Sequence, residues 1–367
     1  MPSRGPISPV RVLVVDDSVV VRKLLFEALG SAREITVIDT ASSGAIALAK
    51  IRSLHPDVVT LDIEMPGLNG IETLVEIRKL HPKLPVIMVS TLTERGASAT
   101  VEALSLGASD YVTKPSNSES RSAVISQIRR ELVAKILSLA SRTRGPHVMP
   151  PAKGKSGAPR VDVLAIGVST GGPNALAEVI PHLPVDFPVP IVIVQHMPPL
   201  FTRLLADRLS AQSQVPVREA EAGKKLEPGQ VWIARGDYHM TVARKGTNVV
   251  LNLNQDAPEN SCRPAVDVLF RSVAQVYGAN VLGVVLTGMG ADGALGATQI
   301  QMAGGEIFVQ DEASSVVWGM PGAVVVAGAA DKIFALPEIG PQIVNRVCQD
   351  RAGRIVPLAI RRMSAGL

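Results

Sequence analysis

Apolar and polar positions alternate in blocks along the first part of the chain, up to about residue 115. Mostly apolar runs predict buried strands over Val10–Val15, Val58–Leu61 and Val86–Val89. Apolar residues at helical spacing from Val20 to Ala28 predict an amphipathic helix after the first run. Strands that alternate with helices are typical of βαβ units, so the pattern predicts a doubly wound parallel sheet.

The pattern changes twice further along the chain. Apolar residues recur every three or four positions from Ile125 to Leu139 and predict an amphipathic helix that ends the first domain or begins a linker. The stretch 144–159 is rich in Gly, Pro, Ser and Lys, which indicates a flexible linker. A second alternation begins at Val161, interrupted by one predicted hairpin whose strands are His239–Lys245 and Asn248–Asn254.

These patterns predict an α/β protein built from two doubly wound parallel-sheet domains. We expect the first domain at 9–128, the end of the amphipathic helix and a basic Gly/Pro/Ser-rich linker at 129–160, the second domain at 161–350 and a basic tail at 351–367.

Composition and charge narrow the classes of function. Hydrophobic residues make up 46% and charged residues 19% of the chain, as expected for globular domains. The net charge of +4 is local, because 121–160 alone carries +8 and the remainder therefore sums to −4. We interpret the basic segment as a solvated linker. Aromatic residues are only 3%, so we expect no nucleic-acid partner.

Cysteine content and apolar stretches indicate the compartment. Cys262 and Cys348 form no disulfide framework and no metal-binding spacing, so both are expected to be ordinary small apolar residues in a reducing compartment. The first residues lack the apolar core of a signal peptide, and the uncharged stretch Ala313–Ala330 is broken by two glycines and a proline. We therefore expect a cytoplasmic chain that does not insert into a membrane.

Acidic and polar residues follow the predicted strands of the first domain. Asp16 and Asp17 come directly after the first strand, Asp62 ends the third apolar run, and Ser90 and Lys114 follow later runs. Carboxylates brought together at one sheet edge repel each other unless a divalent cation such as Mg²⁺ neutralises them. Taken singly, Asp17 or Ser90 is better explained as a helix N-cap, but the whole set is not.

This set resembles the receiver domain of two-component response regulators, which has a flavodoxin-like fold. The matching stretches are Asp16–Asp17, Asp62–Gly67, Ser90 and Lys114–Pro115. The resemblance implies that Asp62 accepts a phosphoryl group and that Asp16, Asp17 and Asp62 hold Mg²⁺. It further implies that Lys114 pairs with the acyl phosphate and that Ser90 and Tyr111 act as the switch pair.

Three reactive residues follow apolar runs of the second domain. Ser169 lies in a G-x-S-x-G pattern after Val163–Ile166, His196 follows Ile191–Val194, and Asp292 follows Val281–Leu286. The glycines allow a sharp turn at the serine, and the next helix would aim its positive end at a developing oxyanion. A serine, a histidine as general base and an aspartate that orients it suffice for acyl transfer.

Two points remain open from the residues alone. The chain order Ser, His, Asp differs from the lipase order Ser, acid, His, so a different fold with the same constellation is expected. His239 is the one rival for the role of base. The backbone N–H near Met289 is our expected oxyanion donor.

The second half of the chain resembles the protein-glutamate methylesterases of bacterial chemotaxis, which implies a Rossmann-like catalytic domain. The matching segments are Gly167–Pro173, Val194–Pro198, Pro228–Met240, Arg263–Asp267 and Leu286–Gly293. The resemblance implies a triad of Ser169, His196 and Asp292, with Thr170 in the site. Ala265 and Arg235 depart from the family pattern, where a serine and a proline are frequent; both lie outside the triad segments.

The expected protein is thus a phosphorylation-activated serine esterase that needs no cofactor for ester hydrolysis. The resemblance implies demethylation of γ-glutamyl methyl esters on methyl-accepting chemoreceptors, deamidation of receptor glutamines and phosphorylation by a chemotaxis histidine kinase. Three alternatives compete: a transcriptional regulator whose basic segments bind DNA, a nucleotide-binding module, and an inert signalling adaptor. The strand-rich second half argues against the first, and the absence of a P-loop lysine argues against the second.

Overall fold

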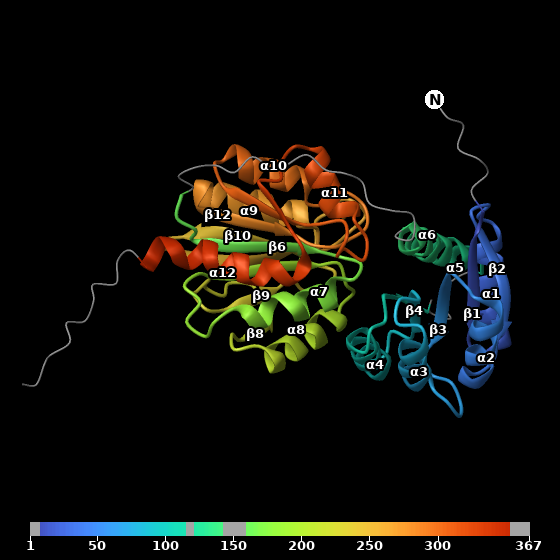
Figure 1. The fold of residues 1–367 in the computed structure, drawn as a ribbon. Coiled ribbons are helices and arrows are strands. Elements are labelled where there is room, and N and C mark those ends of the chain that lie inside the picture. The colour runs from blue at the N-terminus through green and yellow to red at the C-terminus, as the bar shows by residue number, and fades with distance from the viewer. Residues whose placement is uncertain (1–7, 115–120, 142–158, 353–367) are drawn as a thin grey trace, which may run out of the picture.

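The computed structural model describes residues 8–114, 121–141 and 159–352, which form two α/β domains (Figure 1). Most of the basic linker expected at 129–160 and of the basic tail lies outside these residues. In the described part of the chain, no helix is both long and apolar enough to cross a membrane.

The N-terminal domain is a five-stranded parallel sheet in the order β2-β1-β3-β4-β5, as the doubly wound pattern predicts. Its strands are β1 (Val10–Val15), β2 (Ile35–Ala41), β3 (Val58–Asp62), β4 (Val86–Ser90) and β5 (Asp110–Thr113). Its helices are α1 (Val19–Gly30), α2 (Gly44–Leu54), α3 (Gly70–Leu80), α4 (Glu94–Ser105), α5 (Arg121–Ile128), the π-helical η1 (Arg129–Val133) and α6 (Ala134–Ser141).

Local signals explain where the helices of this domain begin. Ser18, Ser43, Asn69 and Thr93 each cap a helix by accepting a hydrogen bond from a backbone N–H three residues later. Glu72 completes a capping box with Asn69 at the start of α3. Helices α2, α3 and α4 bury their apolar faces on one side of the sheet, and α1 with η1 and α6 on the other. All strands therefore point their carboxyl ends to one edge.

The C-terminal domain is a seven-stranded sheet in the order β14-β13-β12-β6-β7-β9-β8, in which every pairing is parallel. Its strands are β6 (Val163–Val168), β7 (Ile191–Gln195), β8 (Val217–Glu219), β9 (Val231–Ile233), β12 (Val281–Val285), β13 (Glu306–Gln310) and β14 (Lys332–Phe334). Its helices are α7 (Gly172–Val179), α8 (Phe201–Gln212), α9 (Val266–Tyr277), α10 (Ala294–Met302), α11 (Gly319–Val326) and α12 (Leu336–Ala352), with 3₁₀ turns η3 (Ile180–His182) and η4 (Gly278–Asn280).

This sheet is covered on both faces. Helices α7, α8 and α12 contribute to the apolar cluster on one side, and α9, α10 and α11 to the cluster on the other. The predicted hairpin is confirmed as β10 (His239–Lys245) paired antiparallel with β11 (Asn248–Asn254). Both expected doubly wound sheets are therefore present, and β6, buried along its whole length, forms the centre of the second.

The two domains meet where α4 packs against α7 and α8 (Figure 1). Tyr111 at the end of the first sheet stacks on Phe201 of α8, with ring centroids 4.9 Å apart and planes 9° from parallel. Glu94 pairs with Arg203 at 2.9 Å, and the Arg208 guanidinium donates to the carbonyl of Val101 at 2.8 Å. One aromatic stack and two polar contacts thus hold the α4 side of the N-terminal domain against the second domain.

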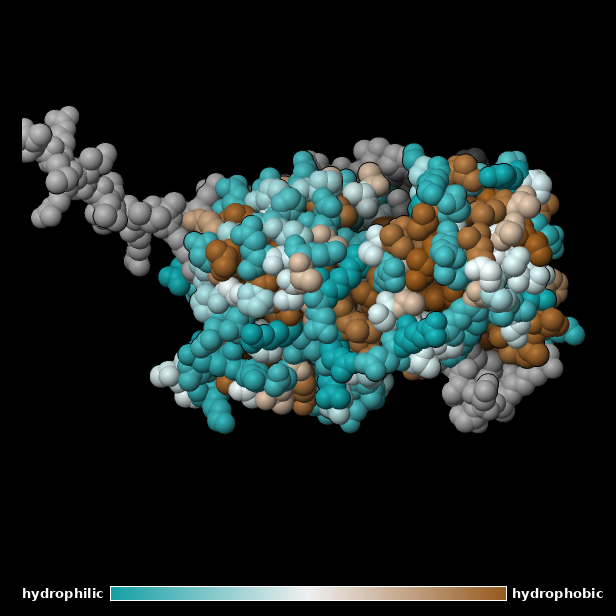
Figure 2. Space-filling view, turned by 90° about the horizontal axis from the view of Figure 1, so that it is seen from below, coloured by the Kyte–Doolittle hydropathy of each residue, from teal (hydrophilic) through white to brown (hydrophobic). Residues whose placement is uncertain are grey.

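A second contact joins the end of the N-terminal domain to loops of the C-terminal sheet. Val317 belongs to the same buried apolar cluster as Leu132 and Leu139 of the η1–α6 helix, and Met289 and Val316 pack on it. On the face seen in Figure 2, hydrophilic residues dominate the C-terminal domain, whereas larger hydrophobic patches lie on the N-terminal domain. The domain interface therefore leaves apolar surface of the N-terminal domain exposed.

Candidate active site

Ser169 and His196 begin the loops after two neighbouring strands. Val168 pairs with Gln195 across β6 and β7, so the next residue of each strand starts at the same level of the sheet edge. The chain runs from β6 to β7 in one direction, and β12 lies on the other side of β6. This reversal of strand order is the position at which open α/β sheets bind ligands.

Asp292 reaches this position from the loop after β12. Its Oδ2 lies 2.7 Å from His196 Nε2. The same carboxylate accepts backbone hydrogen bonds from Val266 at 2.7 Å and Asp267 at 3.0 Å, at the N-terminus of α9. The Asn260 amide donates a further bond of 2.9 Å to its Oδ1. A carboxylate that is 2% exposed is thus stabilised by two backbone donors, an amide and the imidazole.

The hydrogen bond between His196 and Asp292 shifts the pKa of both side chains. Burial lowers the pKa of His196, but the hydrogen bond to Asp292, assisted by the Cys262 sulfur, outweighs it and raises the pKa to about 9. Burial opposes ionisation of Asp292 as well, yet the hydrogen bond and charge of His196 bring its pKa below the usual value. The neutral imidazole that a general base requires therefore forms as the pH rises through about 9.

The serine lies in a tightly packed loop. A Cβ on Gly288 would come within 2.9 Å of Ser169 Cβ, so only glycine lets the β12 loop approach this closely. The Gln195 amide donates to the carbonyls of Ser169 at 3.0 Å and His196 at 3.3 Å. Ser169 is half-buried, and its hydroxyl makes no hydrogen bond to His196 in this structure. Such catalytic contacts often tighten only when substrate binds.

The expected supporting residues are Thr170, next to the serine in the chain, and Met289, in the loop after β12. Thr170 is buried, and its carbonyl accepts a hydrogen bond of 2.9 Å from the Thr287 hydroxyl. Met289 follows Gly288 and packs on the apolar cluster shared with the N-terminal domain. A contact of the N-terminal domain therefore lies one residue from the glycine that touches Ser169.

Sequence reasoning missed two side chains of this site. The expectation that Cys262 is an ordinary apolar residue is wrong, because its Sγ lies 3.6 Å from His196 Nδ1. Asn260 also bridges the carboxylates of Asp292 and Asp267, both at 2.9 Å. Both missed residues belong to a loop without periodicity, so only the fold brings them next to His196 and Asp292. The rival base, His239, is buried with both ring nitrogens bonded to backbone groups of Ala257 and Ala265.

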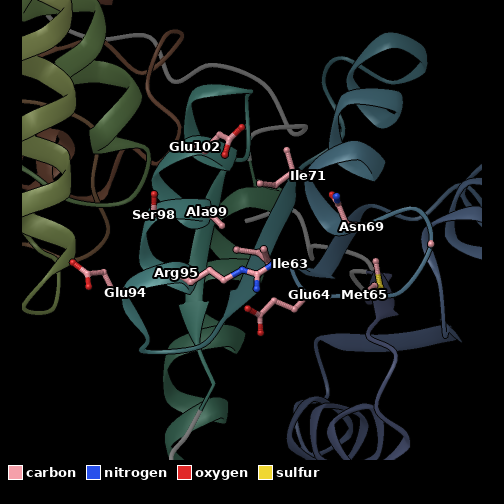
Figure 3. A pocket seen from close by; sticks show the side chains of 11 residues that line it. Ile63, Glu64, Met65, Asn69, Ile71, Glu94, Arg95, Ser98, Ala99 and Glu102 are labelled. Atoms are coloured by element: carbon pink, nitrogen blue, oxygen red, sulfur yellow. The ribbon is translucent and has the colours of Figure 1, made fainter.

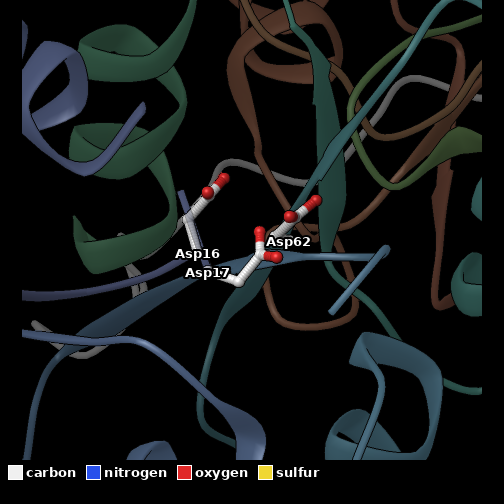
Figure 4. A group of neighbouring side chains, drawn as sticks. All are labelled: Asp16, Asp17 and Asp62. Carbon is white, nitrogen blue, oxygen red and sulfur yellow. The ribbon is translucent and has the colours of Figure 1, made fainter. Parts of the chain in front are cut away.

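The acidic residues of the N-terminal domain also converge (Figure 4). Asp16, Asp17 and Asp62 each offer an oxygen, and these oxygens all lie within 4.8 Å of one another. Lys114 Nζ lies 3.0 Å from Asp16 and 2.9 Å from Asp62. Burial is the main cause that raises the pKa of Asp62 to about 6, against the opposing effect of Lys114. The Asp62 Oδ2 is buried without a hydrogen-bond partner, so these residues fit a hard divalent cation.

The two expected switch residues point to different neighbours. The Ser90 hydroxyl donates to the carbonyl of Gly96 at 3.0 Å, in the first turn of α4. Tyr111 is buried in the domain interface on Phe201. Because α4 itself packs on α8, both residues connect the Asp62 end of the sheet with the interface.

A groove of about 900 Å³ opens beside the acidic cluster (Figure 3). Its lining runs from Ile63 and Glu64, directly after Asp62, to Glu94 and Glu102 on α4. Glu94 is also the partner of Arg203 in the other domain. The groove therefore separates the loop after Asp62 from the helix that holds the interface.

Comparisons with known proteins agree with this geometry. Family models match the response regulator receiver domain over 12–126 and the CheB methylesterase over 164–343. A protein-glutamate methylesterase/protein-glutamine glutaminase of Trichodesmium erythraeum is 49% identical over 347 residues, which are 92% of this chain and 99% of that protein. The chain belongs to this family.

Further relatives extend the match. The protein of the same name from a Nocardioides species is 50% identical over 93% of this chain and 96% of its own. The crystal structure of the Thermotoga maritima CheB methylesterase catalytic domain is 41% identical, covers 51% of this chain and 99% of its own, and has a TM-score of 0.50. The expected family, fold class and enzyme class are confirmed, and a DNA-directed effector is not favoured. A receiver domain also indicates Mg²⁺-dependent phosphorylation in general.

A catalytic role of the His196–Asp292 pair, the dyad, predicts how the rate of this methylesterase depends on pH. In the wild type, kcat/KM for a methyl ester should rise with pH as His196 loses its proton, with a midpoint near 9. Asp292→Asn removes the charge that raises this pKa, so the midpoint should move to lower pH. The maximal rate should fall by on the order of 10⁴-fold because the imidazole tautomer is lost.

Asp256→Asn, on the exposed loop after β11, is the matched control for this change and should leave the profile unaltered. An Asp292→Asn profile with the wild-type midpoint would contradict the assignment of the dyad.

Proposed function

We propose that this methylesterase hydrolyses γ-glutamyl methyl esters on the cytoplasmic helices of methyl-accepting chemoreceptors and releases methanol. We extend the proposal to deamidation of receptor glutamines, the same acyl transfer with ammonia as the leaving group. The observation that carries it is the His196–Asp292 contact next to Ser169, at the sheet edge where the strand order reverses beside β6. Relatives named for both activities match nearly the whole chain.

The roles of the three residues follow from their contacts. Asp292 occupies Nε2 of His196, so Nδ1 is the nitrogen left to accept the Ser169 hydroxyl proton. Ser169 Oγ then attacks the ester carbonyl, and His196 returns the proton to the departing methanol. Water, deprotonated by the same imidazole, attacks the glutamyl ester on Ser169 and restores the receptor carboxylate. No metal ion takes part in these steps as proposed.

Backbone groups near Ser169 supply the charge stabilisation that acyl transfer needs. The N-terminus of α7 begins three residues after the serine, and its free N–H groups carry partial positive charge. We assign the oxyanion donors to the backbone around Thr170 and Met289. Because Met289 packs against the N-terminal domain, the position of this donor depends on the domain contact.

Regulation begins at Asp62. In the proposal Asp16, Asp17 and Asp62 hold Mg²⁺, which when bound neutralises charge on the transferred phosphoryl group. Asp62 takes the phosphoryl group from a histidine kinase, and Lys114 pairs with it. A phosphoryl group adds about −1.5 to −2 charges, which draws the Ser90 hydroxyl away from Gly96. Tyr111 and α4 then shift, the stack on Phe201 is lost, and the domain contact loosens.

The direct test is methanol release from methylated chemoreceptor membranes, with and without acetyl phosphate and Mg²⁺. Release should rise with the phosphodonor, disappear in Ser169→Ala and lose its response to the phosphodonor in Asp62→Asn. Absence of release from the wild type while Asp62 is phosphorylated would contradict the proposed substrate. Release that does not change with the phosphodonor would support the ester hydrolysis and refute its regulation by phosphorylation.

The ion pair across the domain interface offers a separate test of whether the domain contact keeps the unphosphorylated enzyme at a low rate. Glu94→Arg or Arg203→Glu alone places like charges together across the interface and should raise the unphosphorylated rate by roughly two- to fivefold, because an exposed pair contributes little. The double variant restores the attraction with the charges exchanged and should return to the low basal rate. Single variants with wild-type basal release would show that this contact does not hold the enzyme closed.

A further inference from the structure

Cys262 is held in a rigid loop beside the catalytic imidazole. The loop closes through paired backbone hydrogen bonds between Glu259 and Cys262, with Asn260 and Ser261 at φ +53° and +61°. Arg271 binds the Glu259 carboxylate through two hydrogen bonds of 2.5 Å. The backbone therefore fixes where the thiol points.

The loop contacts both members of the dyad. Asn260 donates to Asp292, and two residues later the Cys262 sulfur lies 3.6 Å from His196 Nδ1. Nε2 is already occupied by Asp292, so Nδ1 is the nitrogen through which the base must act. In this structure the thiol, and not the Ser169 hydroxyl, contacts that nitrogen.

We propose that Cys262 is a positioning residue of the esterase, which holds His196 by its base nitrogen and stabilises the imidazolium formed when Ser169 gives up its proton. The proposal rests on the proposed ester hydrolysis and names a residue beyond the triad. The Cys262 side chain acts through its contact with the imidazole and is assigned no covalent role.

The thiol can contact both protonation states of the ring. Its S–H donates to neutral Nδ1, and its sulfur accepts from the protonated Nδ1–H. The second contact is the stronger one because the donor is charged. Cys262 therefore favours the imidazolium, in the same direction as the raised pKa of His196. Its removal should weaken the base at high pH while leaving more neutral imidazole at low pH.

The test measures the protonation of His196 directly, by ¹⁵N NMR of the full chain labelled in histidine, with His196→Gln to assign the signals. The pKa should fall by roughly half a unit or more in Cys262→Ala and should lie between the two values in Cys262→Ser, which retains a hydroxyl. Cys348→Ser, the other cysteine of the chain, is the matched control and should behave as wild type. A wild-type pKa in Cys262→Ala would overturn the proposal.

Kinetics provide the second readout. A pKa lowered by half a unit gives about threefold more neutral imidazole at pH 7, so the Cys262→Ala and wild-type profiles should cross: the variant is faster at neutral pH and slower on the alkaline plateau. A variant slower by one factor at every pH would indicate a purely structural role and overturn the proposal. Cys262→Val, close in volume, replaces the alanine variant if that does not fold.

The NMR titration needs no substrate, so it separates this proposal from the function above. A His196 pKa that is lowered in Cys262→Ala, without methanol release by the wild type, would refute the proposed substrate and support the positioning role.

Discussion

The parallel pairing of β6 with β7 and β12 is the constraint on which the arrangement of Ser169, His196 and Asp292 depends. Residue Gly167 pairs with Val285, and Val168 pairs with Gln195, so three loops start at one edge of the sheet. Gly167 also lets α9 pack closely on β6, because a Cβ there would come 2.3 Å from Val266. The N-terminus of α9 is thereby placed where its backbone N–H groups bind Asp292. One packing arrangement fixes His196, Asp292 and the Ser169 loop together.

Both domains place their reactive side chains in the same part of the fold, although the chemistry differs. Each gathers buried carboxylates at the carboxyl ends of parallel strands, where burial alone would favour their neutral forms. In the methylesterase domain, His196 and a helix N-terminus keep Asp292 ionised, which raises the pKa of the imidazole. In the receiver domain, Lys114 opposes the raised pKa of Asp62 only in part, and a buried carboxylate oxygen is left for a cation. The interface then joins the two sites through α4 and Tyr111.

Much of this architecture could be predicted because the chemistry follows long apolar runs. Asp62, Ser169 and His196 each end or follow such a run, so the parallel sheet alone brings them to an edge. The contributions of Asn260 and Cys262 could not be predicted, since their partners lie 32 and 66 residues away and their loop has no periodicity. The stack of Tyr111 on Phe201 also escaped prediction, because a domain interface leaves no mark in either domain's own pattern. The π-helical turn at Arg129–Val133 interrupts an otherwise correctly predicted helix.

The most direct test of the account is the site at which a serine-directed phosphonate labels the full chain. The dyad should make Ser169 the labelled residue, identified by peptide mass spectrometry, and His196→Gln should slow the labelling strongly while Cys348→Ser leaves it unchanged. Labelling at another residue, or at Ser169 with the same rate in His196→Gln, would contradict the claim that this histidine activates this serine.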